Sequence, residues 1–277
     1  MNKKEFKDIL KKDKEIIDKK IKEFFHPLEN KLDQAVFYAI DGGKRIRPIV
    51  FLETAKMLRG DDFTKDDLDL AISLEMIHAY SLIHDDMPCM DNDDYRRGKE
   101  TVHKKYGEDM ALLAGDYLLN TAYENILDLA SKDKKIGKAG AYMAKCAGKD
   151  GMIKGQYYDV FKEESYDLSY VLKVYEGKTG GLFKAALVGA GLSLGEDSST
   201  IEKLERYGKY LGLSFQLQDD LLDGKDQDEL NILNVLDEDE AKKYLHKFNQ
   251  EAKDAVSNFD KNDFHIFLID YLSTRTI

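Results

Sequence analysis

The chain has 277 residues, of which 43% are hydrophobic and 34% are charged, and its formal net charge at pH 7 is −11. That hydrophobic content is enough for a sizeable core, and the acidic balance argues against nucleic acid as a partner, because binding a phosphate backbone needs a basic surface. The two isolated cysteines, Cys89 and Cys146, exclude a disulfide framework and predict a cytoplasmic protein, and no apolar run approaches the roughly 20 residues that span a bilayer, so we expect no stable membrane insertion.

Apolar residues recur with helical spacing along nearly the whole chain, and no β-hairpin turn separates alternating apolar runs. The expected helices cover residues 3–25, 29–40, 48–59, 67–86, 107–131, 135–162, 168–193 and 199–223, with one or two more before the C-terminus. The chain contains no long linker, low-complexity segment or fixed-period repeat. It is therefore predicted to form one all-α domain over residues 1–277.

The segment 67–86 has apolar residues in almost every direction around a helix. A helix that is apolar all round is buried, so this one is expected at the centre of the molecule. Its polar exceptions include Ser73, Glu75, His78 and Ser81, and buried polar groups need hydrogen-bond partners.

A first acidic cluster ends this buried helix and contains Asp85, Asp86 and Asp91. Asp91 lies too far around a continuous helix to share the face of the other two. Pro88 disfavours helix at the residue before it, so we expect the chain to turn here and bring Asp91 back.

A second cluster contains Asp219, Asp220 and Asp223, of which the first and last are four residues apart and share one helix face. Crowded carboxylates repel one another, and solvent exposure alone would relieve that repulsion. Two such clusters beside apolar helices instead favour Mg²⁺, which binds a few carboxylates and keeps its other positions for water and phosphate oxygens.

Basic residues complement these acids in three turns that also contain glycine. They are Gly42-Gly43-Lys44-Arg45-Ile46-Arg47, Arg96-Arg97-Gly98-Lys99 and Lys178-Thr179-Gly180-Gly181. Each alone could be a solvated turn. Together with the aspartate clusters they predict diphosphates held by metal on one side and by Arg or Lys on the other.

Several motifs in order resemble those of the trans-isoprenyl diphosphate synthases, the polyprenyl synthetase family. SLIHDDMPCMDNDDYRRGKETVH and FQLQDDLLD resemble its two aspartate-rich motifs, and GGKRIRP, LLAGDYLL, GMIKGQ, KTGGLF and DYLSTR match in its order. The resemblance implies a helical bundle of the isoprenoid-synthase type around a deep central cavity. It also implies a trans-prenyltransferase, similar to bacterial farnesyl diphosphate synthases and commonly homodimeric.

The resemblance also implies residue roles. Magnesium, as three ions with substrate bound, would lie between Asp85, Asp86 and Asp91 on one side and Asp219, Asp220 and Asp223 on the other. Isopentenyl diphosphate would be held by Lys44, Arg47, His78 and Arg97. The allylic diphosphate would be held by Arg96, Lys178, Thr179 and Gln216. The diphosphate would leave as the allylic C–O bond ionises, and the double bond of isopentenyl diphosphate would attack the resulting cation. Loss of a proton to the released diphosphate would then form the double bond of the product.

Product length is expected to depend on residues before Asp85 on the buried helix. Tyr80 and Ser81 lie about 6–8 Å below it at 1.5 Å per residue. The resemblance links an aromatic residue at this position to a C15 product, farnesyl diphosphate. Tyr80 as ordinary core filling is the alternative, as are C10 and C20 products.

The segment after Asp223 is shorter than the family pattern and lacks clear counterparts of its loop lysines, for which Lys225 is a possible substitute. This shortening leaves open a non-catalytic partner subunit. A class I terpene cyclase is also open, although it would need no isopentenyl diphosphate site.

Overall fold

The computed structural model describes residues 1–226 and 229–274 of the chain, and the end of the DYLSTR motif, from Arg275, lies outside them. The helices are α1 (Lys3–Phe25), α2 (Lys31–Ile40), α3 (Ile46–Arg59), α4 (Lys65–Asp85), α5 (Val102–Tyr106), α6 (Glu108–Ala130), α7 (Lys134–Ala147), α8 (Met152–Val160), α9 (Leu168–Lys178), α10 (Gly180–Leu194), α11 (Ser198–Asp223), α12 (Glu238–Val256) and α13 (Asp263–Ser273), with a 3₁₀ turn, η1 (Ile232–Asn234), before α12. Two-residue strands, β1 (Tyr95–Arg96) and β2 (Lys99–Glu100), form one antiparallel pair.

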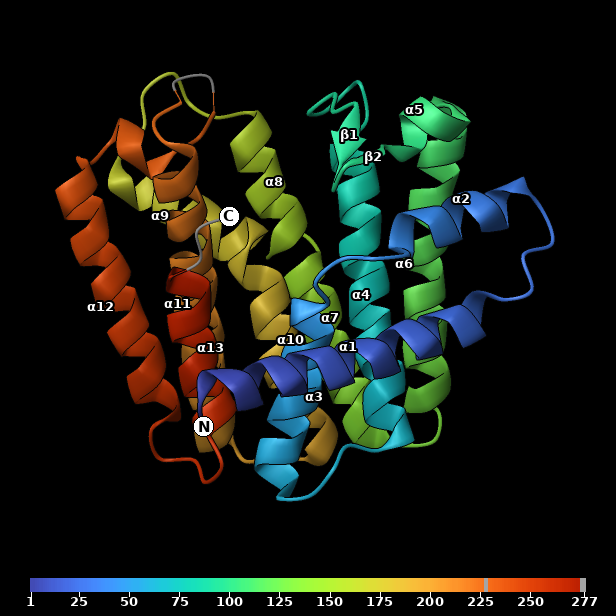
Figure 1. The fold of residues 1–277 in the computed structure, drawn as a ribbon, viewed down its shortest axis with the longest axis horizontal. Coiled ribbons are helices and arrows are strands. Elements are labelled where there is room, and N and C mark those ends of the chain that lie inside the picture. The colour runs from blue at the N-terminus through green and yellow to red at the C-terminus, as the bar shows by residue number, and fades with distance from the viewer. Residues whose placement is uncertain (227–228, 275–277) are drawn as a thin grey trace.

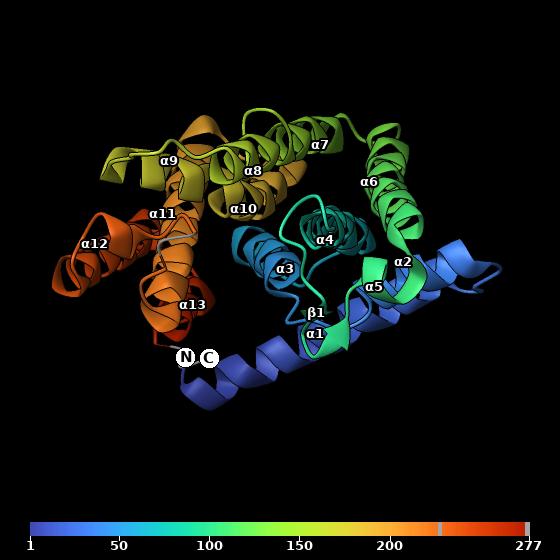
Figure 2. The same ribbon diagram turned by 90° about the horizontal axis from the view of Figure 1, so that it is seen from above.

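The helices α3 and α4 occupy the centre of the bundle, and the other long helices surround them (Figure 1, Figure 2). Fourteen residues of α4 are buried, on all sides of the helix. The prediction of a central helix over residues 67–86 is therefore confirmed. Thr64 begins α4: its hydroxyl oxygen accepts a hydrogen bond from the amide of Asp67, and its own amide donates to the Asp67 carboxylate.

The helix α1 crosses one side of the bundle and is tied to it by ion pairs as well as by apolar contacts (Figure 2). Asp13 pairs with Lys56 at 3.1 Å, and Lys20 pairs with Asp69 at 2.6 Å. Phe6 is fully buried and packs against Phe264. The N-terminal helix thus shares the core of the bundle.

The prediction of one helix over residues 135–162 is wrong, because the chain breaks between α7 and α8 at Gly148–Gly151. A Cβ atom at Gly151 would lie 1.8 Å from the carbonyl oxygen of Cys146, so the turn between α7 and α8 has no room for a side chain at this position. Helical periodicity resumes directly after the break, which is why the sequence concealed it.

A tight turn joins β1 and β2 within the otherwise helical chain. Arg97 and Gly98 both have positive φ angles, 53° and 75°, as a two-residue hairpin turn with right-handed strand twist requires. The flanking residues are polar, so an alternating apolar pattern could not reveal this hairpin.

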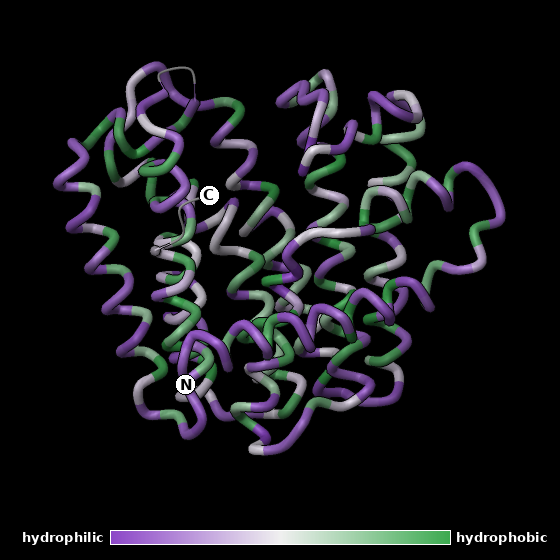
Figure 3. The backbone as a smooth tube through the Cα atoms, in the orientation of Figure 1, coloured by the Kyte–Doolittle hydropathy of each residue, from purple (hydrophilic) through white to green (hydrophobic). Residues whose placement is uncertain are grey.

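Two clusters of buried residues fill the molecule. The larger surrounds α3, α4 and α10, and the smaller joins α9, α11, α12 and the segment before α12. The loops at the upper rim are largely hydrophilic (Figure 3). Among the helices that the structure describes, none is long and apolar enough to cross a membrane.

Candidate active site

The polar residues inside α4 all have partners. The Glu75 carboxylate accepts from Arg45 at 2.7 Å, Ser73 Oγ accepts from Asn125 Nδ2 at 2.8 Å, and Ser81 Oγ donates to the carbonyl of His78 at 2.9 Å. The central helix therefore carries polar groups into the core without leaving them unsatisfied, as buried polar groups require.

The first aspartate cluster turns back on itself as the sequence predicts. The amide of Asp91 donates to the carbonyl of Asp85 at 2.9 Å, and the amide of Asn92 donates to the carbonyl of Met87 at 3.1 Å. Asn92 has a φ of 55°, a left-handed conformation that asparagine tolerates. The turn after α4 thus returns Asp91 to the end of the helix that carries Asp85.

Cations balance the carboxylates of this cluster only in part. Asp86 is buried and accepts from Arg96 Nε at 2.6 Å. Burial raises the pKa of Asp85 to about 6, with nearby Lys178 opposing the shift and Asp91 adding to it. A carboxyl group with so high a pKa is one that a bound cation would stabilise in its charged form.

The second cluster lies on the last turn of α11, a regular helix to Asp223. Asp223 is exposed, Asp219 is half-buried, and Asp220 is buried. Burial raises the pKa of Asp220 to about 6, against the hydrogen bond that it accepts from the Tyr175 hydroxyl. The three acids of this cluster therefore have different surroundings.

The basic turn before α3 separates its cations. Arg45, at a φ of 55°, points into the protein, where its guanidinium donates to Asp18 at 2.8 Å, to Glu75 at 2.7 Å and to the carbonyl of Ile40 at 2.7 Å. The expectation that the cations of this turn face a bound anion is thus wrong for Arg45, which faces carboxylates of the protein itself. Its charge is neutralised internally, and it fixes the turn that carries Lys44 and Arg47.

Arg47 and His78 meet beside this buried ion pair. Arg47 Nη1 donates to His78 Nε2 at 3.2 Å, which leaves the ring proton on Nδ1, because a guanidinium cannot accept. Burial lowers the pKa of Arg47 to about 10, and burial together with Arg47 lowers the pKa of His78 well below its usual value. His78 is therefore neutral at pH 7.

Arg97 lies directly over the glycine turn. A Cβ atom at Gly43, whose φ is 96°, would lie 2.4 Å from Nη1 of Arg97. The guanidinium could move aside, so it is the left-handed φ that favours glycine here. A cavity of about 170 Å³ opens here between the turn and the hairpin, and Gly42, Gly43, Asp86, Arg96 and Arg97 line it.

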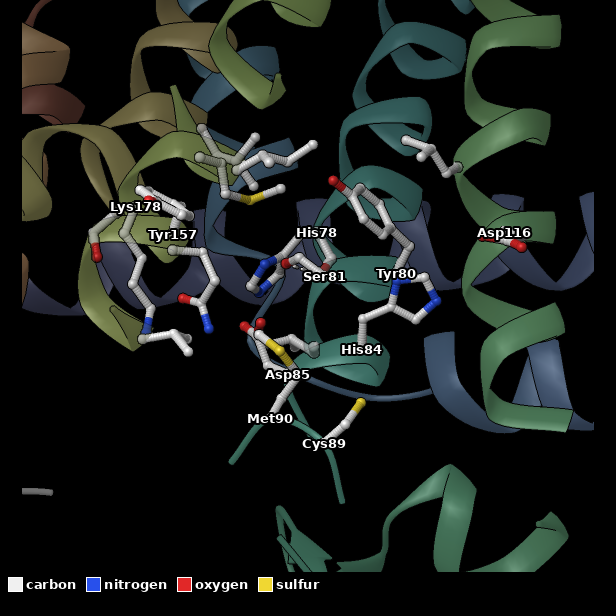
Figure 4. A pocket seen from close by; sticks show the side chains of 18 of the residues that line it. His78, Tyr80, Ser81, His84, Asp85, Cys89, Met90, Asp116, Tyr157 and Lys178 are labelled. Carbon is white, nitrogen blue, oxygen red and sulfur yellow. Dashed lines mark hydrogen bonds between the residues drawn. The ribbon is translucent and has the colours of Figure 1, made fainter. Parts of the chain in front are cut away.

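A larger cavity of about 620 Å³ runs beside α4, and Arg47, His78, Ser81, Tyr80, Asp85, Lys178 and Thr179 are among the side chains that line it. Asp85 and His78 lie toward Lys178, whereas Tyr80 lies on the other side with His84 and Asp116 (Figure 4). Apolar side chains from α6 and α8, including Leu119 and Ile153, complete the wall. The cavity thus has a charged end at Asp85 and Lys178 and a mainly apolar remainder.

A third cavity, of about 330 Å³, shares Lys178 and Thr179 with the large one. Asp91 of the first cluster and Gln216 of α11 both line it. Thr179 Oγ1 donates to Gln216 Oε1 at 2.8 Å. The predicted residues of the basic turn at Lys178, of the first cluster and of α11 therefore converge on one polar space.

Two residues of this region were not singled out from the sequence, Asp159 and Gln156 in α8. Asp159 forms an ion pair with Lys178, and both side-chain polar atoms of Gln156 are buried with no partner among the described residues. Gly155 lets α8 approach this closely, since a Cβ atom there would lie 2.1 Å from the amide nitrogen of Lys178. The GMIKGQYYD stretch was the available signal.

Lys225 does not reach these cavities. It is exposed and lines a separate opening beside Leu233 and Glu238. Glu229 and Leu230 of the same segment line the polar cavity instead. Nothing in the described segment supports Lys225 as a substitute for the loop lysines.

The donor set fits a hard divalent cation. Asp85, Asp91, Asp219 and Asp223 supply only carboxylate oxygens, and Mg²⁺ takes one or two of these together with water and substrate phosphate. Within residues 1–226 and 229–274, no three acidic, histidine or cysteine side chains gather closely enough to hold a metal ion by themselves.

Comparison with known proteins identifies the family of the chain. The polyprenyl synthetase family matches residues 29–243. The chain belongs to the polyprenyl synthetase family. It is a trans-prenyltransferase of the all-helical isoprenoid-synthase fold, as the sequence motifs predicted.

Individual relatives agree with this membership. The chain is 37% identical to farnesyl diphosphate synthase of Micrococcus luteus over 94% of each chain. It is 35% identical to the large subunit 1 of the chloroplastic heterodimeric geranylgeranyl pyrophosphate synthase of Arabidopsis thaliana, over 84% of this chain and 68% of that protein. The solved geranyltransferase of Legionella pneumophila superimposes with a TM-score of 0.89, at 28% identity over 99% of this chain and 98% of that one.

Proposed function

We propose that this prenyltransferase joins isopentenyl diphosphate head to tail with an allylic diphosphate, dimethylallyl or geranyl, and that its main product is farnesyl diphosphate. The observation that carries the proposal is the large cavity beside α4, charged near Asp85 and Lys178 and apolar beyond them. A diphosphate at the charged end would place its hydrocarbon tail in the apolar part. The farnesyl diphosphate synthase of Micrococcus luteus supports the C15 product.

Magnesium is proposed as the cofactor, held by Asp85 and Asp91 on one side and by Asp219 and Asp223 on the other, as three ions when substrate is bound. Asp86 and Asp220, which the resemblance also assigns to the metal, accept hydrogen bonds from Arg96 and Tyr175 respectively. When bound, the ions would neutralise charge on the departing diphosphate.

The isopentenyl diphosphate site is proposed at Lys44, Arg47, His78 and Arg97. The low pKa of His78 keeps the ring neutral, so its Nδ1–H donates a hydrogen bond without adding a further charge beside Arg47. The buried guanidinium of Arg47 lies in a region of low polarity, where its attraction to a phosphate is stronger than in water.

The allylic diphosphate site is proposed at Arg96, Lys178, Thr179 and Gln216. Three of these residues line the polar cavity, and Lys178 and Thr179 also line the apolar one. The reacting carbon would therefore lie where the two cavities meet. The apolar wall would keep water away from the allylic cation, so that the double bond of isopentenyl diphosphate attacks it first.

Product length is proposed to depend on Tyr80, with Ser81 beside it in the cavity wall. Tyr80→Ala opens the cavity and is expected to move the main product from C15 to C20 or longer, measured by chromatography of dephosphorylated products. Tyr80→Phe keeps the ring and should still give C15. An unchanged product from Tyr80→Ala would leave Tyr80 as core filling only.

The assembly is proposed to be a cytoplasmic homodimer in which residues 1–277 act as one domain. Four apolar side chains exposed along α6 support such an interface: Leu112, Leu113, Tyr117 and Leu127. Light scattering coupled to size-exclusion chromatography measures the mass of the assembly directly.

The activity test incubates the purified protein and Mg²⁺ with labelled isopentenyl diphosphate and a C5, C10 or C15 allylic primer. We expect elongation of the C5 and C10 primers to C15. No elongation of any primer would contradict the synthase proposal and favour a non-catalytic subunit. A cyclic hydrocarbon formed without isopentenyl diphosphate would favour a cyclase.

A further inference from the structure

The middle acid of the second cluster, Asp220, lies inside the protein. Its exposed fraction is 4%, whereas Asp223 on the same turn of α11 is exposed. The two acids have the same side chain and lie three residues apart, so their different environments come from the segment that packs against the helix end.

The contacts of Asp220 are with neutral donors. Its Oδ2 accepts from the backbone amide of Ile232 at 2.7 Å and from the hydroxyl of Tyr175. The same amide lies 3.1 Å from the Tyr175 oxygen, so the three groups form one closed set. Gln216 Nε2 approaches the other oxygen, Oδ1, at 3.4 Å.

These bonds hold the shortened segment between α11 and α12. Ile232 is fully buried in the smaller core cluster together with Val174 and Leu217. Asn231 Nδ2 donates to the carbonyl of Gly224 at 3.0 Å, and its Oδ1 accepts from the amide of Leu233 at 2.8 Å. Asp220 thus gives this segment a charged acceptor from outside the segment itself.

This geometry disfavours direct coordination of a metal by Oδ2. Two hydrogens, one on nitrogen and one on oxygen, point at this atom, and their partial positive charges repel an approaching cation. Coordination through Oδ2 would disturb both bonds and leave the amide of Ile232 with only its longer contact to the Tyr175 oxygen, which costs free energy.

We propose that Asp220 is a positioning residue that anchors residues 229–236 on the end of α11 and does not bind magnesium itself. The inference rests on the proposed function only in its reference to the metal. The anchored segment carries Glu229 and Leu230, which line the polar cavity together with Asp91. Asp220 therefore sets the wall of the allylic diphosphate site through the backbone of Ile232.

The first test needs neither metal nor activity. Amide hydrogen exchange is measured on the full chain without Mg²⁺ for the wild type, Asp220→Ala, Tyr175→Phe and Asp223→Asn. Loss of the anchor should speed exchange in residues 229–236 by about tenfold in Asp220→Ala, because a lost hydrogen bond is of that order, and by less in Tyr175→Phe. Asp223→Asn should exchange as the wild type does, and equal exchange in Asp220→Ala and the wild type would overturn the proposal.

The second test measures the Mg²⁺ concentration that gives half-maximal product formation. Asp223→Asn should need at least tenfold more Mg²⁺, while Asp220→Asn and Tyr175→Phe should stay within about threefold of the wild type. If Asp220→Asn shifts the requirement as far as Asp223→Asn does and Tyr175→Phe does not, Asp220 is a ligand and the proposal fails. A wild type that makes no product would contradict the proposed function, yet the exchange result would still decide the role of Asp220.

Discussion

The two aspartate clusters carry the same acids in differently built frames. The first is a turn after α4 and is balanced by charged partners, since Arg96 pairs with Asp86 and Lys178 lies near Asp85. The second is the end of a regular helix, where Asp220 accepts from the hydroxyl of Tyr175 and the amide of Ile232. In each cluster the second acid of the Asp-Asp pair is buried and bound to the segment that follows it.

This difference indicates two ways of holding a loop beside a metal site. An arginine adds a charge that must itself be neutralised, and removing Asp86 would leave the half-buried Arg96 with only the longer ion pair to Asp93. Neutral donors add no charge and are less costly to leave behind, but they require a closely fitted backbone. The shortened segment after Asp223 meets that requirement by placing a single amide against the carboxylate.

The largest effect is expected on replacing the first acid of each Asp-Asp pair, Asp85 or Asp219. Asp85→Asn and Asp219→Asn should each lower kcat/KM by roughly 10²–10³-fold, since each removes a proposed metal ligand from the site where diphosphate charge develops. Steady-state kinetics at saturating Mg²⁺ measures this. If only Asp85→Asn loses activity, the second cluster does not bind the catalytic metal, and the two clusters have different functions.

Replacing the second, buried acid of each pair, Asp86 or Asp220, should change the stability of the protein by different amounts. Asp86→Asn removes the charge of the nearer partner of Arg96 and leaves only Asp93 at 3.6 Å, so it should lower the free energy of unfolding by about 2 kcal/mol. Asp220→Asn, which keeps an acceptor for Ile232, should cost about 1 kcal/mol. Denaturant unfolding without Mg²⁺ gives both values. The reverse order would show that neutral donors hold the more important loop.

A pH series sharpens the charge side of the comparison. The folded pKa of Asp85 is raised to about 6, above its usual 3.8, so the protonated form is favoured by folding. Its contribution to stability is present below about pH 4 and is lost as the pH rises through 6. The wild type without Mg²⁺ should therefore lose stability between pH 4 and 6, and Asp85→Asn should lose less. The slopes of their unfolding free energies against pH should differ by about 1 kcal/mol per pH unit. Parallel curves for the two proteins would contradict the assignment.

The smallest effect concerns the turn itself. Pro88→Ala should cost about 0.5–1 kcal/mol, because the unfolded chain gains freedom that proline removes. It should also raise the Mg²⁺ requirement, since Asp91 depends on this turn to lie beside Asp85. Thermal unfolding and a Mg²⁺ titration measure the two quantities. A Mg²⁺ requirement equal to that of the wild type would show that the turn forms without the proline.

Much of the site was predictable because its signals are local. The spacing of Asp219 and Asp223 fixes their shared face on any helix, and Pro88 predicts the turn that returns Asp91 to Asp85. The apolar content of residues 67–86 was enough to place α4 at the centre. The break between α7 and α8 was not predictable in the same way, because the glycine at 151 is required by a contact with Cys146 that only the folded chain makes.

By itself, the sequence determined most of the helices, the central one among them, the acidic and basic motifs and the family. These follow from periodicity and from residue chemistry, which act over a few positions. Only the tertiary structure decided that Arg45 turns inward to Asp18 and Glu75, that Asp159 pairs with Lys178 and that Asp220 receives the amide of Ile232. The physical reason is that a buried charged side chain must pair with a group that packs beside it. Which group that is depends on contacts between segments far apart in the sequence.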